Sequence, residues 1–584
     1  MLRCRRLVTM VGITVMGWPA VSAAQSVSNP SFEQDGTGVA GPAGWTSKGS
    51  VNADFTEFGG STGDFRLTHW SAEAFSVATS TTVTGLRDGW YTLRGRVRRS
   101  AGENDSYLEL SCDHGQRERV YLPVAWPDQW LEVTASSYVR KGRCTITLHT
   151  QGAAGEWSNF DDIRLVPGAH YLPVRGVDVS SLNKSEDLGG RYFDAKGAPP
   201  IGKHPKAFER SLHAHRHGHG HERGHGHGHG HGSAFWSWFG PTPHHKHAKH
   251  HWPGAGKQTS SSALKILKDS GVSHARFRVW VDPADGYHDV DAVVEMSRRA
   301  HQTGLDVLVD LHFSDTWADP AHQAKPAAWE GYSVMELEKA VYDHTYEVCS
   351  RIKRRSGRAP DMIQIGNELN AGMLWPDGHT WDPPNWENLA GFLSAGYAAV
   401  KACSPSTDVM LHLADGGDNG LYQWWFDNIT ALGVSFDVIG VSYYGYWHGS
   451  LGDLQWNLND ISARYDKDVI VVETAYPSTL EDEDGWPNIV GLPEQLVPGY
   501  PATPEGQYRN FRDVMSIVRA VPGGRGLGAF YWDATWTAVP GNGWDPTDPS
   551  SGNAWENQAL FDFDDRALPA MDVFGEVDFD KCWR

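Results

Sequence analysis

The chain has 584 residues, enough for more than one domain, and 40% of them are hydrophobic, which supplies ample material for cores. Its formal net charge is −20 and no long basic patch occurs outside a histidine tract, so the composition argues against nucleic-acid binding. Beyond the N-terminal residues, no stretch is apolar enough to span a membrane. Tryptophan is abundant, with 26 residues, which we expect to serve both large cores and sugar recognition.

Residues 1–24 have the pattern of a secretory signal peptide. Arg3, Arg5 and Arg6 precede a short apolar stretch, and Val21-Ser22-Ala23-Ala24 offers small residues for cleavage. A membrane anchor is the weaker alternative, because the apolar run is shorter than the roughly 20 residues that a spanning helix needs. We therefore expect a soluble, secreted protein, either extracellular or periplasmic.

Six cysteines are present, and Cys4 leaves with the signal peptide. Cys112 and Cys144 lie in one strand-rich region, and an oxidising compartment favours a disulfide between them. The second candidate pair joins Cys349 and Cys403, on helices that follow successive predicted strands. The cysteine spacings match no zinc motif.

Residues 25–168 read as an all-β domain. Short alternating segments such as Trp90-Tyr91-Thr92-Leu93 and Cys144-Thr145-Ile146-Thr147 are separated by turns rich in Gly, Asp and Ser. This pattern predicts a β-sandwich of the jelly-roll kind.

From residue 171 to residue 584 the pattern changes to buried strands that alternate with amphipathic helices. Eight strands with helices between them predict a (β/α)8 TIM barrel, and an open doubly wound sheet is the alternative. No Gly-rich phosphate loop supports that alternative. The predicted strands cover residues 172–179, 274–280, 306–312, 361–368, 408–415, 436–444, 468–473 and 526–533.

An insert at about residues 196–257 follows the first predicted barrel strand. Residues 213–232 nearly alternate His and Gly, a composition that cannot build a core, so we expect disorder without a ligand. Its imidazoles suit zinc, nickel or copper, and the alternative is a tolerated flexible loop without a role.

Two of the predicted strands end in glutamates. Asp361-Met362-Ile363-Gln364-Ile365-Gly366-Asn367-Glu368 is an apolar strand that ends in an amide and a carboxylate, and residues 468–473 end in Glu473. A carboxylate at the carboxyl end of a barrel strand points into the mouth of the barrel, where chemistry is done. A pair of them suggests retaining glycoside hydrolysis. The alternative for either glutamate alone is that it caps the next helix.

Other predicted strands also end in polar or aromatic side chains, and a full ring of them at one end is hard to reconcile with a purely structural barrel. The ring consists of Arg278, His312, Asn367, Glu368, His412, Tyr443 or Tyr444, Glu473 and Trp532.

This set resembles the retaining (β/α)8 glycosidases and, more narrowly, glycoside hydrolase family 53, the endo-β-1,4-galactanases (arabinogalactan endo-β-1,4-galactanases). The resemblance covers most of residues 171–575, and the histidine tract has no counterpart in the family pattern. The matching stretches are Gly176-Val177-Asp178-Val179-Ser180-Ser181, Arg278-Val279-Trp280, His312-Phe313-Ser314-Asp315-Thr316-Trp317-Ala318-Asp319-Pro320, Gly366-Asn367-Glu368, Val441-Ser442-Tyr443-Tyr444, Val472-Glu473-Thr474-Ala475-Tyr476-Pro477 and Trp555-Glu556-Asn557-Gln558-Ala559-Leu560-Phe561.

The resemblance implies a role for each residue at the mouth. Glu368 is the general acid and base, and Glu473 is the nucleophile, which must stay ionised while Glu368 holds its proton. We expect Arg278 to keep Glu473 ionised, Tyr443 or Tyr444 to hydrogen-bond it, and Asn367 to donate to the sugar 2-hydroxyl. His312, His412 and Trp532 bind sugar, together with Trp375 in the loop after Glu368. Trp532 and Trp375 form the floor and wall of the cleft. For His312, the alternative is a residue packed in the barrel interior.

The β-sandwich region resembles the β-1,4-galactan-binding modules of carbohydrate-binding module family 61, through Leu67-Thr68-His69-Trp70 and Gly89-Trp90-Tyr91-Thr92-Leu93. The resemblance implies that Glu33 with Asp161 or Asp162 holds a structural calcium, and the alternative is that these acids cap turns. Trp70, Trp126 and Trp157 are candidates for sugar stacking or for core.

A second calcium candidate lies after the seventh predicted barrel strand. Asp482, Asp484 and Asn488 stand at even spacing in an acidic loop, where some family members hold calcium. Trp486 stands where those relatives have a ligand, and a solvated acidic turn is the alternative. The chemistry itself requires no cofactor.

We therefore expect a retaining endo-hydrolase of β-1,4-galactan or type I arabinogalactan from plant cell walls, with no nucleic-acid or membrane partner. The alternatives are a β-mannanase or cellulase on the same barrel, or a non-catalytic galactan- or metal-binding protein.

Overall fold

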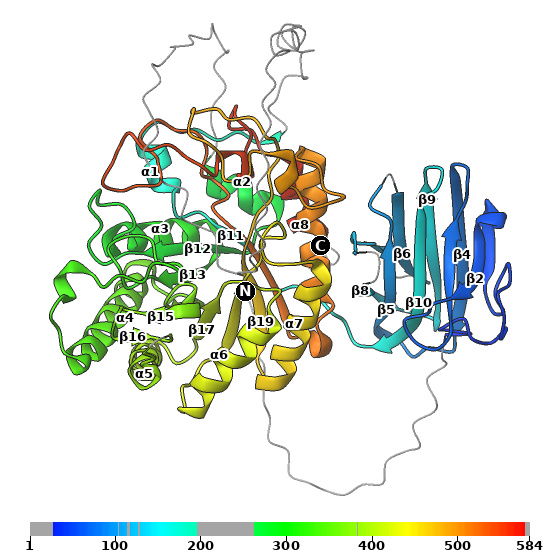
Figure 1. The fold of residues 1–584 in the computed structure, drawn as a ribbon, viewed down its shortest axis with the longest axis horizontal. Helices are drawn as coiled ribbons and strands as arrows, with labels where there is room; N and C mark the ends of the chain where they lie inside the picture. Colours follow the sequence, from blue (N-terminus) through cyan, green and yellow to red (C-terminus); the bar gives the residue numbers. More distant parts are fainter. Residues whose placement is uncertain are drawn as a thin grey trace, which may run out of the picture.

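The computed structural model describes residues 27–102, 104–113, 117–126, 129–195, 262–381 and 383–577. The predicted signal peptide and the His/Gly insert lie outside these residues. In the described part of the chain, no helix combines the length and apolar character that crossing a bilayer requires. The structure contains a β-sandwich and a closed barrel, the two folds that the sequence predicts. The two lie side by side (Figure 1).

The sandwich consists of two five-stranded antiparallel sheets, in the orders β1-β4-β9-β6-β7 and β2-β3-β10-β5-β8. Leucine, valine and phenylalanine at alternate positions face inward; Leu67, Leu93, Leu148 and Phe160 are fully buried. The strands are β1 Thr46–Gly49, β2 Asp54–Phe58, β3 Phe65–Trp70, β4 Phe75–Thr84, β5 Gly89–Arg99, β6 Asn104–Cys112, β7 Arg117–Tyr121, β8 Leu131–Val139, β9 Arg143–Gly152 and β10 Trp157–Pro167.

Eight parallel strands close into the barrel in chain order, and helices cover its outside. The strands are β11 Val174–Asp178, β12 His274–Val279, β13 Asp306–Leu311, β14 Met362–Ile365, β17 Asp408–Leu413, β18 Val438–Ser442, β19 Asp468–Thr474 and β20 Gly526–Tyr531. The helices are α1 Leu182–Asp187, α2 Ala263–Ser270, α3 Val290–Thr303, α4 Val334–Ser356, α5 Trp386–Cys403, α6 Asn419–Ala431, α7 Leu451–Tyr465, α8 Pro504–Arg519 and α9 Asp572–Glu576. A two-stranded hairpin, β15 Gly372–Met373 with β16 Gly378–His379, follows β14.

Inside the barrel, the inward-facing positions change character along each strand. Leu308, Met362 and Met410 belong to an apolar cluster within the barrel, and Phe530 approaches so closely that a side chain at Gly176 would collide with its ring. Two residues further along the same strands, the inward positions carry Asp310, Gln364 and His412. The amino-terminal half is therefore a packed core, and the carboxyl-terminal half forms a polar mouth.

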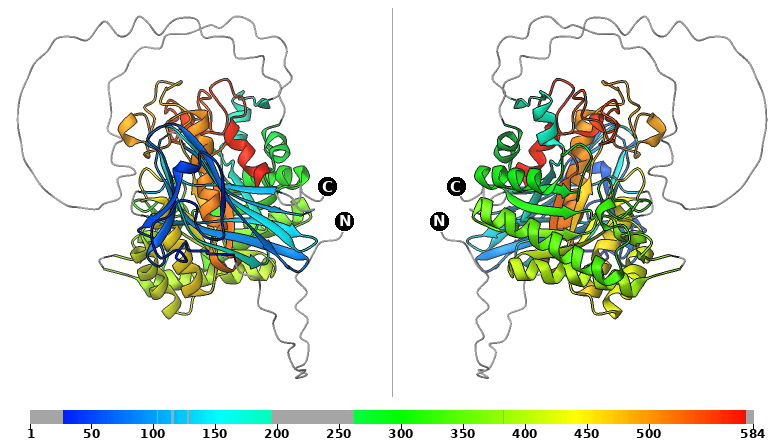
Figure 2. Two further views of the ribbon diagram at one scale, coloured as in Figure 1. Left: turned by 90° about the vertical axis from the view of Figure 1, so that its right-hand side faces the viewer. Right: turned by 90° about the vertical axis from the view of Figure 1, so that its left-hand side faces the viewer.

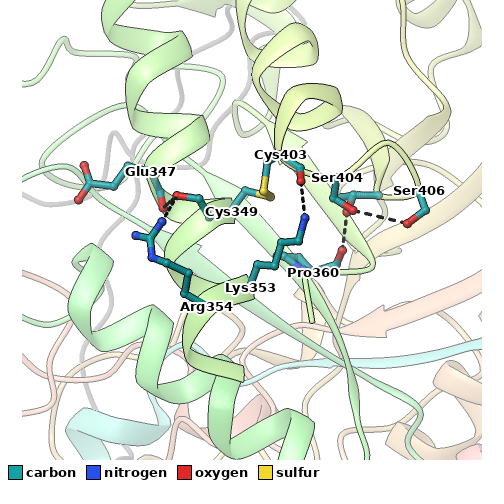
Figure 3. Close-up of a disulfide and its surroundings, with 10 residues drawn as sticks. Glu347, Cys349, Lys353, Arg354, Pro360, Cys403, Ser404 and Ser406 are labelled. Carbon is teal, nitrogen blue, oxygen red and sulfur yellow. Dashed lines mark hydrogen bonds between the residues drawn. A yellow bond between two sulfur atoms is a disulfide. The ribbon is translucent and has the colours of Figure 1, made fainter. Parts of the chain in front are cut away.

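Two disulfides link the described cysteines: the predicted one, and one between the two cysteines that the sequence offered as a second candidate pair. Cys112 on β6 joins Cys144 on β9 across paired strands. Cys349 on α4 joins Cys403 at the end of α5 (Figure 3). Beside this bond, the Lys353 ammonium donates to the Cys403 carbonyl over 2.7 Å, at the helix end where a cation is favourable.

The sandwich packs against α7 and α8 of the barrel (Figures 1 and 2). Arg519, at the end of α8, donates to the Glu118 carboxylate over 2.6 Å and to the Thr134 carbonyl. Its side chain is only 7% exposed, so the ion pair is shielded from water. Buried charged hydrogen bonds of this kind fix the relative orientation of two surfaces.

Candidate active site

Glu368 and Glu473 line the same cavity at the carboxyl ends of the barrel strands. Both are nearly buried, at 8% and 5% exposure. Glu368 lies three residues beyond the end of β14 and has a left-handed backbone, with φ of 45°. A non-glycine residue held there is strained, a feature that clusters at functional sites. The cavity is lined by Arg276, Arg278, Asp310, His312, Trp317, Ala318, Asp319, Asn367, Glu368, Tyr444, Glu473 and Trp532.

A β-bulge sets the direction of Glu473. The register between β18 and β19 pairs Val441 with Val471 and then Ser442 with Glu473, so one residue of β19 is skipped. An extra residue in one strand reverses which side chains face inward beyond it. The bulge therefore brings Glu473 level with Ser442, which contacts Glu368.

Arg276 is the cation that holds Glu473. Its guanidinium lies 2.9 Å from Glu473 Oε1, from Asp178 and from Asp310, and the side chain is 1% exposed. The prediction that Arg278 holds Glu473 is wrong, because Arg278 instead pairs with Asp533 at 2.8 Å. Both arginines face inward from β12, two residues apart, and Arg276 is the earlier of the two along the strand.

Tyr444 supplies the second contact to Glu473. Its hydroxyl donates to Glu473 Oε2 over 3.0 Å. Of the two tyrosines that the sequence left open, Tyr443 points elsewhere and donates to the Gly449 carbonyl over 2.9 Å.

The side-chain hydrogen-bond partner of Glu368 is a neutral hydroxyl, without a cation like the one that Glu473 has. Ser442 donates its hydroxyl hydrogen to Glu368 Oε1 over 2.7 Å, and His412 lies 2.8 Å from the Ser442 oxygen. Burial lowers the pKa of His412 well below its ordinary value, so the ring is neutral. Its Nδ1 accepts from the Glu368 amide over 3.3 Å, so the ring hydrogen is on Nε2, which donates to Ser442. His412 does not line the cavity, so the predicted sugar contact is wrong; the ring instead holds Glu368 through its backbone amide and through Ser442, a residue that no sequence pattern marked.

The two glutamates differ in how tightly they hold a proton. Burial, and then the charge of Glu473, raise the pKa of Glu368 well above its ordinary value. Burial also raises the pKa of Glu473, to about 7, while the Arg276 guanidinium opposes that rise. Glu473 therefore ionises first and Glu368 keeps its proton, which is the division of roles between an acid and a nucleophile.

Asn367 is held rigidly beside the pair. Its carbonyl oxygen accepts from Arg276 and from Gln364, each over 3.1 Å, and its amide nitrogen donates one hydrogen to the Ala318 carbonyl over 2.8 Å. The amide carries a second hydrogen, which is the donor available for a sugar hydroxyl.

His312 and Trp532 line the cavity, as predicted, and Trp375 does not. His312 Nε2 lies 2.9 Å from Asp310, and its Nδ1 accepts from the Trp280 indole over 3.2 Å. Trp375 donates to the Ala371 carbonyl over 2.8 Å and packs edge-on against His379 in the hairpin. Trp317 lies 6.1 Å from Trp532, ring centre to ring centre, and supplies the cavity wall that the sequence analysis assigned to Trp375.

The acidic loop after β19 gathers oxygen ligands. Oxygens of Asp482, Asp484 and Glu556 all lie within 4.8 Å of one another. Glu556 Oε2 and Asn488 Oδ1 are buried and have no hydrogen-bond partner, whereas the Asn488 amide nitrogen donates to the Glu481 carbonyl. Hard oxygen donors with unsatisfied lone pairs fit a calcium ion. Glu556 was not among the predicted ligands, because it comes from a distant part of the chain.

We expect calcium to raise the thermal stability of the protein through this cluster. An ion that binds the folded state at 100 times its Kd contributes about 2.7 kcal/mol, which for a domain of this size raises Tm by roughly 3–5 °C. Calorimetry with calcium and with a chelator measures the shift. Glu556→Gln should abolish it, and Glu481→Gln, which removes an exposed charge of the same loop outside the cluster, should leave it intact. An equal shift in the wild type and Glu556→Gln contradicts this site.

Glu33, Asp161 and Asp162 do not form a comparable cluster. Glu33 Oε1 accepts from the amides of Asp64 and Phe65, and Asp161 Oδ2 accepts from the amides of Ser61 and Thr62. Asp162 pairs with Arg164. These contacts favour the alternative that the three acids tie the ends of the sandwich to a turn.

Comparison with known proteins places residues 244–574, more than half of the chain, in the sequence model of "Glycosyl hydrolase family 53". An uncharacterised protein of Niallia circulans is 44% identical over 53% of this chain and 84% of its own length. The arabinogalactan endo-beta-1,4-galactanase of Thermothelomyces thermophilus is 34% identical over 55% of this chain and 93% of its own length. The solved GH53 catalytic domain of Ignisphaera aggregans superposes with a TM-score of 0.57 and 36% identity, covering 70% of this chain and 98% of that chain. The chain is a glycoside hydrolase and belongs to glycosyl hydrolase family 53.

Proposed function

We propose that the protein is a secreted, retaining endo-β-1,4-galactanase that acts on galactan and type I arabinogalactan. The observation that carries the proposal is one cavity in which Arg276 and Tyr444 hold Glu473 while Glu368 accepts a hydrogen bond from the neutral Ser442 hydroxyl. The galactanase activity of the Thermothelomyces relative supports the substrate.

In the first step, Glu473 attacks the anomeric carbon and Glu368 gives its proton to the leaving glycosidic oxygen. The C–O bond to the leaving sugar breaks as the bond to Glu473 Oε forms, so a covalent glycosyl-enzyme results. As Glu473 loses its negative charge, the pKa of Glu368 falls, because that charge helps to hold its proton. Glu368 can then act as a base.

In the second step, Glu368 removes a proton from water, which attacks the anomeric carbon and releases Glu473. Two inversions at the same carbon give net retention. Arg276 stabilises the carboxylate that departs, and Asn367 offers its second amide hydrogen to the sugar ring. Trp532 and Trp317 offer flat rings to the apolar faces of the sugars.

The test is hydrolysis of β-1,4-galactan, with β-1,4-mannan and cellulose as the competing substrates. We expect a rapid fall in viscosity and short galacto-oligosaccharides from galactan, because an endo-enzyme cuts within the chain. Faster hydrolysis of mannan or cellulose supports the alternative enzymes on the same barrel, and binding to galactan without any hydrolysis supports a non-catalytic protein.

The pH profile of kcat/KM should be bell-shaped. Glu473 must be ionised, and with a pKa of about 7 activity falls as the pH drops below that value. Glu368 must be protonated, and its pKa is raised further, so activity falls on the alkaline side. Initial rates across the pH range measure both limbs, and Glu368→Gln, which cannot ionise, should lose the alkaline limb. A profile that rises steadily with pH contradicts these assignments.

We also propose that the β-sandwich binds galactan and that the N-terminal 24 residues direct export. Exposed tryptophans on the sandwich support the first proposal, with Trp70 42% exposed and Trp126 55% exposed. N-terminal sequencing of the protein from the culture medium tests the second, because cleavage after the small-residue segment is expected.

A further inference from the structure

A second cavity lies between the sandwich and the barrel, and residues of both domains line it. Its volume is about 220 Å³. Val124 and Trp126 line it from the sandwich, and Tyr443, Tyr446 and Leu496 line it from the barrel. These barrel residues belong to the loops after β18 and β19, so the cavity opens at the same end of the barrel as Glu368 and Glu473.

The sandwich loop that carries Trp126 is fastened to the barrel on both sides. The Val124 amide donates to the Tyr500 hydroxyl over 3.2 Å. Beyond Trp126, the Gln129 side chain donates to Asp453 over 3.2 Å and accepts from the Ser450 hydroxyl over 2.7 Å. These hydrogen bonds hold the loop against the barrel. Trp126 is nevertheless 55% exposed, so its ring is accessible to a ligand.

One loop of the barrel lines both cavities. Tyr444 lines the cavity of the two glutamates, whereas Tyr443 and Tyr446 line the cavity between the domains. The rings of Tyr444 and Tyr446 are stacked with centres 5.9 Å apart, and Trp447, 38% exposed, contacts both rings. Contacting aromatic rings therefore extend from the buried Tyr444 beside Glu473 to the cavity at the domain boundary.

A second group of aromatic residues lies on the sandwich. Trp70 on β3 pairs in register with Trp157 on β10. Arg98 on β5 lies over the rings of both Trp157 and Trp130, at 5.8 and 4.7 Å. Trp130 follows Gln129 directly, so this row ends at the loop that carries Trp126. Flat rings at successive positions suit stacking against successive sugars of a chain.

We propose that the cavity between the domains is a distal galactan subsite, in which Trp126 of the sandwich and Tyr446 of the barrel hold galactosyl residues of the same chain that is cut at Glu368 and Glu473. The subsite rests on the proposed galactanase function. In this arrangement the sandwich forms part of the substrate cleft. An independent binding module would instead hold a separate stretch of the polymer. A substrate too short to reach from the glutamates to Trp126 gains nothing from it.

The test is kcat/KM for β-1,4-linked galacto-oligosaccharides of increasing length, in the wild type and in Trp126→Ala. We expect equal values for the shortest substrates and a loss of roughly three- to tenfold for the longer ones, the size typical of one aromatic contact. Trp126→Phe, which keeps a ring for stacking, should recover most of the loss. Trp456→Ala is the matched control, because Trp456 on α7 is 66% exposed and is not among the residues that line this cavity.

The subsite is overturned, while the galactanase proposal stands, if galactan is cleaved and Trp126→Ala matches the wild type at every length, or if the loss in Trp126→Ala is the same at every length. A loss of equal size in Trp456→Ala also overturns it. If the wild type cleaves mannan or cellulose and does not cleave galactan, both proposals fail, because the ligand of the subsite is then misassigned.

Discussion

Replacing Glu473 by glutamine should lower kcat on galactan by about 10⁶-fold, the scale of loss seen when an enzyme nucleophile is removed. The amide has nearly the shape of the carboxylate, so it keeps a contact to Arg276 and Tyr444 and the fold should persist. It cannot form the covalent glycosyl-enzyme. Steady-state kinetics with purified protein, supported by an unchanged circular dichroism spectrum, measures the effect.

External azide distinguishes the loss of a nucleophile from a general disturbance of the site. Glu473→Ala leaves space beside the anomeric carbon, where azide can attack once and invert the configuration, giving an α-galactosyl azide. Glu481→Ala, on an exposed loop, serves as the control and should retain wild-type kinetics. A Glu473→Ala variant that keeps more than about a hundredth of the wild-type rate without azide contradicts the assignment, because the residual activity expected after loss of a nucleophile is far lower.

Replacing Glu368 by glutamine should lower kcat on galactan by about 10²- to 10⁴-fold, the contribution typical of a general acid. The amide cannot protonate the leaving oxygen, although Ser442 still reaches its carbonyl. The size of the loss should depend on the leaving group. With a dinitrophenyl galactoside, whose leaving group needs no proton, the glycosyl-enzyme should form at nearly the normal rate and then accumulate.

Stopped-flow measurement of dinitrophenol release separates the two steps. A burst equal to the enzyme concentration, followed by slow turnover, is the expected trace, because Glu368 also activates water in the second step. Ser442→Ala provides an intermediate case, since it removes only the donor to Glu368. If Glu368→Gln slows the burst of dinitrophenol release as much as it slows cleavage of the polysaccharide, Glu368 is not the acid.

The sequence predicted the barrel because its buried strands are short, nearly continuous apolar runs, and the eight runs fall between amphipathic helices. The ends of strands β14 and β19 then located Glu368 and Glu473 without three-dimensional information. Both disulfides were also predictable, since each pair lies on neighbouring elements of one domain.

The sequence could not show how far along the barrel each side chain lies, how neighbouring strands are registered, or which distant loops meet. Arg276 and Arg278 have the same inward parity, and only the packed barrel shows that the former reaches Glu473. The skipped residue in β19 depends on pairing with β18, which no local pattern reveals. Glu556 meets Asp482 only because two distant loops converge.

The contact between the sandwich and the barrel was equally unpredictable from local sequence patterns. Glu118 and Thr134 are ordinary strand residues in the sequence, and they become interface residues only when Arg519 meets them from α8. Trp126 was one of three equivalent candidates for stacking, and the docked domains single it out because the cavity forms around it.

The most direct test of the two-carboxylate account is to trap the intermediate. A galactobiosyl fluoride that carries fluorine at the 2-position should label the enzyme, and peptide mass spectrometry of the digest identifies the labelled residue. We predict one label per molecule on Glu473, together with release of the β-anomer first when untreated enzyme acts on galacto-oligosaccharides. A label on any other residue, or the α-anomer as the first product, contradicts the account.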